Sequence, residues 1–384
     1  MIKLPSIRES LLMLFHYWSR LYDSKGFPDF EAVYQFALKE GEETYYFYLS
    51  VSGGKAEYSE GKHKSPSITI YSPVSVWLDI ASGKLSGRWG WLTRKYRIQG
   101  PLYYLKMLNK VFSKSLTNEE IPGIEDKIQD FEIPEKRVWE KPDRVLIING
   151  SPRRKSGFTH FYLQYLIKGV EQAGTEVEVV DIYDKKFNIE PCRGCFSCWT
   201  ETNGKCVIED EANELLEKVS NAYLTIYAFP LYISSIPAKL KAFLDRGFIG
   251  VMPFFVPYEN LTRHPLRNTK ERYIVLFSVS GFPEIEHFRP VVETFEGIAR
   301  NSHRPLIATI LRPGAQALYS SPPHRSYLKE VLASLEQAGK ELVEQGKVSK
   351  RILRFISSDY GISKNLWRTY TNLHWFLETK SHMF

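Results

Sequence analysis

The sequence predicts an α/β protein in which a five-stranded, doubly wound parallel sheet follows a smaller α+β domain. Three observations predict this arrangement. The second half alternates short, continuously apolar runs with amphipathic helical segments, the pattern of strands covered on both faces. The first half groups helical segments around consecutive strand-like runs. An acidic stretch punctuated by prolines separates the halves, as expected for a linker.

In the second half, each apolar run is followed by a segment with helical periodicity. The first strand, at 144–149, is uninterrupted Val, Leu and Ile after Arg144, and its helix ends at Gly174, a residue suited to helix termination. The same alternation occurs five times, which indicates a parallel sheet wound in both directions. The expected strands are 144–149, 176–182, 222–229, 273–279 and 306–311, and the expected helices 159–173, 210–220, 237–245, 290–300 and 326–345.

The loop after the first strand has the composition of a phosphate cradle. Ligands of such sheets lie beyond the carboxyl ends of the strands, and the amino end of the next helix favours an anion. The loop lacks the glycine patterns of nucleotide hydrolases and dinucleotide-binding folds. The alternative is a simple turn with a solvated basic cluster. The residues concerned are Gly150, Ser151, Arg153, Arg154, Lys155, Ser156, Gly157, Phe158 and Thr159.

Two further loops at the same edge suit a planar ring. Pro230-Leu-Tyr-Ile-Ser follows the third strand, and Ser280-Gly281 follows the fourth. Tyr232 offers a flat aromatic surface and Ser234 a hydrogen-bonding hydroxyl. A ring between these loops would be stacked and hydrogen-bonded, whereas the alternative for Tyr232 is ordinary packing.

All four cysteines fall within fifteen residues, at Cys192, Cys195, Cys198 and Cys206. Two C-x2-C steps sharing a middle cysteine bring three sulfurs to one side of a tight loop, as in bacterial ferredoxins. Structural zinc sites more often use two separated pairs. An iron–sulfur cluster is therefore favoured over zinc, a disulfide or thiols without metal.

Composition is that of an ordinary globular protein. The chain has 384 residues, 43% hydrophobic and 25% charged, with a net charge of +7. No apolar stretch approaches the roughly 20 residues needed to span a bilayer, and the amino-terminal apolar run lacks the features of a signal peptide. We expect a cytoplasmic protein, a compartment that suits thiolate ligands.

The first half begins with a helix. Ser6 and Glu9 form a capping box. Strands are expected at 44–50, 55–59 and 67–71, and helices at 74–82 and 102–112.

From Lys84 to Lys114 there are eight Lys or Arg, no Asp or Glu, and several interleaved Trp and Tyr. Such a surface suits an anionic membrane, and the alternative is a solvated face. No nucleic-acid-binding motif accompanies it, so no nucleic-acid partner is expected.

From about 143 to 346 the chain resembles the NADPH-dependent FMN reductases of the flavodoxin-like group, and within it the iron–sulfur flavoproteins. The matching pieces are Gly150-Ser-Pro-Arg, the cysteine block with Gly204-Lys-Cys, and Pro230-Leu-Tyr. The resemblance implies noncovalent FMN, with a 4Fe–4S cluster close to the flavin on the four cysteines. The cofactor-binding residues would be Ser151, Arg153, Ser156, Gly157, Phe158, Thr159, Pro230, Leu231, Tyr232, Ile233, Ser234, Ser280 and Gly281.

From about 29 to 115 the chain resembles the sterol carrier protein family. The matching order is Gly54-Lys-Ala-Glu-Tyr, Ser67-Ile-Thr-Ile-Tyr, a helix with Trp77, and Lys95-Tyr-Arg-Ile-Gln-Gly. This resemblance implies an apolar tunnel for a lipid or other hydrophobic ligand. The alternative is a small structural or oligomerisation domain.

These patterns predict four segments: a sterol-carrier-like domain at 1–115, an acidic linker at 116–142, an FMN-binding domain at 143–346 and an aromatic, basic extension at 347–384. The main hypothesis is a homo-oligomeric FMN-dependent oxidoreductase. It would move electrons from NAD(P)H or a ferredoxin-like donor to a quinone or other hydrophobic acceptor, without catalytic side chains of its own because the flavin supplies the chemistry. The alternatives are an electron carrier without its own substrate and a lipid-binding protein with a degenerate flavin domain.

Overall fold

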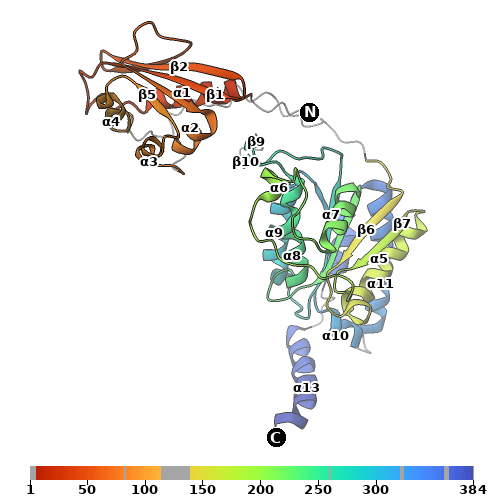
Figure 1. The fold of residues 1–384 in the computed structure, drawn as a ribbon. Coiled ribbons are helices and arrows are strands. Elements are labelled where there is room, and N and C mark those ends of the chain that lie inside the picture. The colour runs from red at the N-terminus through yellow and green to blue at the C-terminus, as the bar shows by residue number, and fades with distance from the viewer. Residues whose placement is uncertain are drawn as a thin grey trace. The chain divides into compact units, whose positions relative to one another are not determined.

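The structure is a computed structural model, and it describes residues 6–81, 84–113, 139–258, 261–320, 324–358 and 363–383. The chain divides into two compact units, Met1–Phe131 and Glu132–Phe384 (Figure 1). Most of the expected acidic linker lies outside the described residues. Among the residues described, no helix combines the length and apolarity needed to cross a bilayer.

The first unit is a five-stranded mixed sheet with helices. Helix α1 (Ile7–Arg20) begins with the predicted capping box, in which Ser6 Oγ accepts from Glu9 N and Glu9 accepts from Ser6 N. Strand order is β3-β2-β1-β4-β5, with β1 parallel to β4 and the other pairs antiparallel. The strands are β1 (Ala32–Glu40), β2 (Glu43–Ser52), β3 (Lys55–Glu60), β4 (Ile68–Pro73) and β5 (Arg97–Gln99), and the other helices α2 (Val74–Ala81), α3 (Gly87–Leu92) and α4 (Leu102–Val111).

Aromatic side chains fill the core of this unit. Phe15 of α1 stacks on Phe47 of β2 with ring centroids 4.8 Å apart, and Trp77 of α2 contacts Trp18 and Phe36. Strand β1 and helix α3 are absent from the expected elements. The alternation that buries Tyr34, Phe36 and Leu38 was available in the sequence as a signal for β1.

The second unit contains the predicted parallel sheet. Strand order is β12-β11-β8-β6-β7, and every pairing is parallel, which is the 2-1-3-4-5 order of flavodoxin-like sheets. Side chains of β6 alternate between two cores: Val145 and Ile147 on one face, Leu146 and Ile148 on the other. The strands are β6 (Arg144–Asn149), β7 (Glu176–Asp181), β8 (Leu224–Pro230), β11 (Tyr273–Val279) and β12 (Leu306–Arg312).

Helices cover both faces of this sheet (Figure 1). Helices α5 (Phe158–Gln172) and α11 (Arg325–Gln345) share one core, and α7 (Ala212–Asn221), α8 (Ala238–Asp245) and α9 (Arg289–Asn301) share the other. Two glycines let α5 and α11 approach closely. A Cβ on Gly169 would lie 1.8 Å from Glu336 O, and one on Gly339 would lie 2.2 Å from Leu166 O.

Several short or peripheral elements were not expected. They include a hairpin of β9 (Val256–Tyr258) and β10 (Leu261–Arg263), the short helices α6 (Ser197–Thr200) and α10 (Ala315–Ser320), and two helices of the extension, α12 (Lys350–Ser357) and α13 (Lys364–Met383).

Helix α12 lies against the edge strand β12. Ser357 Oγ donates to Leu311 O at 3.0 Å, and buried Arg312 donates to Ile356 O at 2.6 Å and Ser358 O at 3.1 Å. Part of the 347–384 extension therefore completes the second unit.

Candidate functional site

An open pocket lies beyond the carboxyl ends of β6, β8 and β11. Its empty space, part of which is open to solvent, is about 600 Å³. Ten of the thirteen expected cofactor residues line it, drawn from three loops far apart in the chain. They are Ser151, Arg153, Gly157, Phe158, Thr159, Pro230, Leu231, Tyr232, Ser280 and Gly281.

Three expected residues lie outside this lining. Ser156 Oγ donates to Arg153 O at 2.7 Å, and Ile233 and Ser234 form the tip of the loop that follows β8. The pocket also takes in Val279, which ends β11, together with two residues of α10, Ala315 and Gln316. The α10 residues follow β12, and the convergence of strand ends at one edge of the sheet could have identified them.

The end of the pocket formed by the first loop offers hydrogen-bond donors that have no partner within the described residues. Helix α5 starts at Phe158, so its first backbone N–H groups have no partner within the helix. Thr159 is 1% exposed and its hydroxyl has no hydrogen-bond partner among the described residues. Gly157 keeps the cradle open, because a Cβ there would lie 2.9 Å from Ser151 Oγ.

Buried polar contacts fix the start of this loop. Asn149 Oδ1 accepts from Ser151 N at 3.1 Å, and Asn149 Nδ2 donates to Asp181 Oδ1 at 2.6 Å. The neighbouring basic residues diverge. Arg153 lines the pocket, whereas Arg154 pairs with Asp184 at 2.6 Å. The pKa of Asp184 lies below its ordinary value, mainly because it accepts from the backbone N–H of Lys186 and also because of Arg154.

The other end is framed by a tight turn. Tyr232 and Ser235 exchange two backbone hydrogen bonds, at 3.1 and 2.9 Å. The two residues between them, Ile233 and Ser234, have φ of 47° and 57°, a left-handed conformation that is unfavourable for a β-branched residue. Ile233 is 98% exposed, so burial of its side chain does not compensate. Strained, exposed turns of this kind concentrate at functional sites.

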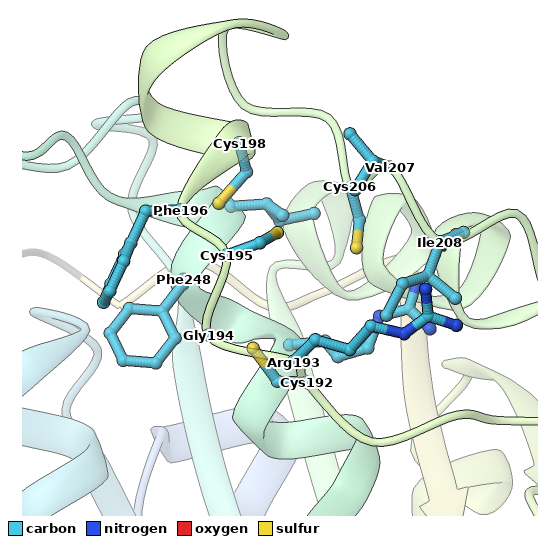
Figure 2. A pocket seen from close by; sticks show the side chains of 12 residues that line it. Cys192, Arg193, Gly194, Cys195, Phe196, Cys198, Cys206, Val207, Ile208 and Phe248 are labelled. Carbon is cyan, nitrogen blue, oxygen red and sulfur yellow. Dashed lines mark hydrogen bonds between the residues drawn. The ribbon is translucent and has the colours of Figure 1, made fainter.

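The four cysteines line a second pocket, and Figure 2 shows their sulfurs around a common space. In the described parts of the chain, no three His, Cys, Asp or Glu side chains come close enough to hold one metal ion. Hydrogen bonds from the Ser197 backbone and side chain lower the pKa of Cys195. Burial, followed by the charges of the other three thiols, raises the pKa of Cys198.

Buried Arg246 supports this cysteine pocket. Its guanidinium pairs with Asp210, whose side chain is 4% exposed, and donates to Ile208 O at 3.1 Å. Arg246 and Ile208 both line the pocket. Two aromatic side chains flank the cysteine pocket. Trp199 Nε1 donates to Phe248 O at 3.0 Å, and the two rings meet edge to face.

The two pockets share no lining residue and lie at opposite ends of α8. Pro230, Leu231 and Tyr232 precede this helix, and Phe248 and Ile249 follow it. Eight helical residues rise about 12 Å. Within one chain, the cysteine pocket and the expected flavin pocket are therefore separate, and the expectation that a cluster lies close to the flavin stays a prediction.

The 2-1-3-4-5 parallel sheet, with a pocket beyond the carboxyl ends of its strands, defines a flavodoxin-like fold. Residues 143–301 match the family with a flavodoxin-like fold, and residues 23–113 match the SCP-2 sterol transfer family. Both resemblances found in the sequence are thereby confirmed.

Curated relatives match part of the chain. An iron–sulfur flavoprotein of Methanocaldococcus jannaschii is 36% identical over 27% of this chain and 51% of its own length. One of Archaeoglobus fulgidus is 35% identical over 36% of this chain and 56% of its own. The chain thus spans about half the length of these relatives. A solved FMN-dependent NADH-azoreductase of Bacillus anthracis aligns at 16% identity and a TM-score of 0.39, over 52% of this chain and 99% of the other.

Proposed function

We propose that the protein is an FMN-dependent oxidoreductase that moves electrons from NAD(P)H or a ferredoxin-like donor to a quinone or another hydrophobic acceptor. The observation that carries this proposal is the buried, unpartnered hydroxyl of Thr159 at the amino end of α5. A buried hydroxyl without a partner is costly, and a flavin phosphate would give it one.

Residues of this chain are available to hold each part of FMN. Backbone N–H groups of the first turn of α5, the hydroxyls of Ser151 and Thr159, and Arg153 would hold the phosphate. The loops at Pro230–Tyr232 and Ser280–Gly281 would hold the ring. Tyr232, 46% exposed, has an aromatic face to offer it. Bound FMN would supply hydride acceptance and electron transfer, so the protein's part is position and electrostatics.

The cysteine pocket suits an iron–sulfur cluster. A cubane cluster attaches its cysteines to different irons, so ligand sulfurs surround a common space instead of meeting at one ion. The four sulfurs have that arrangement (Figure 2). The curated relatives are named iron–sulfur flavoproteins. Because this pocket lies at the far end of α8 from the flavin loops, the cluster would exchange electrons at a different surface of the unit.

The hydrophobic acceptor is inferred from the first unit. Its match to the SCP-2 sterol transfer family supports a lipid-like ligand there. A quinone would satisfy both units, because it accepts electrons and is apolar.

Anaerobic purification tests this function. We expect flavin absorbance with one FMN per chain, acid-labile sulfide with iron, and steady oxidation of NADPH or NADH by a soluble quinone. A pure electron carrier would bind FMN and yet show no turnover without a partner protein. Protein that binds no FMN after saturation would refute the proposal. Iron should disappear in Cys195→Ala while FMN binding remains, and iron retained by that variant would contradict the ligand assignment.

A further inference from the structure

Helix α3 packs against the rest of the first unit at a glycine. Gly90 is buried, and a Cβ there would lie 3.2 Å from Leu85 and 3.3 Å from the Tyr96 ring. Tyr96 Oη donates to Gly87 O at 2.9 Å. These contacts determine which side of the helix faces the domain.

Two large apolar side chains of this helix therefore face solvent. Trp89 is 60% exposed and Leu92 is 56% exposed. Residues three apart lie on one side of a helix, so the two form one apolar ridge. An exposed Trp beside an exposed Leu is costly in water, and at the headgroup level of a bilayer both are favoured.

Cations surround this ridge. Arg88, Arg94 and Lys95 are exposed, and within the described residues none of them belongs to an ion pair. Charge is also segregated along the unit. Residues 84–113 carry seven Lys or Arg and no acid, whereas residues 6–81 carry ten acids and seven bases.

We propose that the first unit docks on an anionic lipid bilayer through the α3 surface, defined as Arg88, Trp89, Leu92, Arg94 and Lys95. The cations attract acidic headgroups while Trp89 and Leu92 enter the interface. The aliphatic Leu92 beside the Trp favours lipid over nucleic acid, whose bases bind by stacking on aromatic rings. This inference does not depend on the proposed flavin chemistry.

Vesicle co-sedimentation of the full chain tests the proposal. We expect binding to vesicles of phosphatidylcholine with 30% phosphatidylserine, and little binding to phosphatidylcholine alone or at 1 M salt. Each cation near an anionic surface contributes about fivefold to affinity. Arg88→Glu with Lys95→Glu should therefore weaken binding by at least about 25-fold. The matched control is Lys25→Glu with Lys64→Glu, two exposed lysines of the same unit, and it should bind much more tightly than the α3 variant.

A second measurement tests whether Trp89 enters the bilayer. Brominated lipid in the vesicles should quench tryptophan fluorescence, and Trp89→Phe should lose most of that quenching while keeping vesicle binding and thermal stability. Equal weakening by the two charge-reversal pairs would overturn the proposal. So would quenching unchanged in Trp89→Phe, or binding to a duplex oligonucleotide with no binding to the acidic vesicles.

Discussion

Replacing Thr159 by Val should change flavin affinity and protein stability in opposite directions. Valine keeps the shape of threonine and removes only the hydroxyl, which is buried and has no partner among the described residues. If that hydroxyl donates to a flavin phosphate, its loss removes a hydrogen bond to a charged group, worth about 1.5–3 kcal/mol. FMN should then bind about 10- to 150-fold more weakly.

The FMN-free variant should be at least as stable as the wild type. Removing a buried hydroxyl that lacks a partner relieves a desolvation penalty. A gain of about 1 kcal/mol would raise the melting temperature by about 2–4 °C for a unit of this size. Calorimetric titration with FMN and thermal melting of apoprotein measure the two effects separately.

Thr175 provides the matched control. It is also buried, at 2% exposure, but its hydroxyl donates to Pro142 O at 2.9 Å. Thr175→Val should lose about 1 kcal/mol of stability and leave FMN affinity unchanged. The reasoning is refuted if Thr159→Val binds FMN as tightly as the wild type, or if it destabilises the apoprotein as much as Thr175→Val does.

Three further comparisons of variants test packing, ion pairing and backbone strain in the second unit. Gly169→Ala should cost at least about 1–3 kcal/mol of stability, because its Cβ would lie 1.8 Å from Glu336 O. The Cβ of Gly297→Ala on α9 would meet nothing within 4 Å, so this variant should gain up to about 1 kcal/mol of stability. Chemical denaturation compares the two variants. Arg246→Met leaves Asp210 buried without its cation. The variant should lose about 3–5 kcal/mol of stability and should also lose bound iron. Arg144→Met, at a pair whose side chains are 62% and 74% exposed, should cost no more than about 1 kcal/mol of stability. A loss for Arg246→Met as small as this one would contradict the importance of the buried pair. Ile233→Asn with Ser234→Gly places the residues that this type of turn prefers at its two left-handed positions. The double variant should raise the melting temperature, because it relieves about 1–2 kcal/mol of strain per residue. A lower melting temperature would mean that the turn is not strained.

The sheet of the second unit followed closely from the sequence. The expected strands at 144–149 and 273–279 coincide with β6 and β11, because uninterrupted apolar runs between turn residues identify strands covered on both faces. The expected helices there differ from the observed ones by at most two residues at either end. The same order placed three loops at one edge, which is why ten of the expected cofactor residues line one pocket.

Several of the elements that escaped prediction are too short to carry a periodic signal in the sequence. Strands β5, β9 and β10 have three residues each, too few to show alternation. Helix α3 has six residues, two of them glycine, and glycine disfavours a helix. The path of residues 182–196 contains no helix or strand, so its direction depends on tertiary contacts such as Glu190 N to Asp210 at 2.9 Å. For that reason the cysteine spacing suggested a ligand set without revealing its distance from the flavin loops.

The position of α12 has a consequence for biosynthesis. Strand β12 is the last strand at one side of the sheet, and an uncovered edge strand is a template for intermolecular pairing and aggregation. Its cover, residues 350–357, is synthesised only after all five strands of the sheet. A nascent or prematurely terminated chain that lacks these residues therefore holds a nearly complete parallel sheet whose β12 edge is uncovered, and we expect the demand for chaperones to be greatest at that late stage of translation.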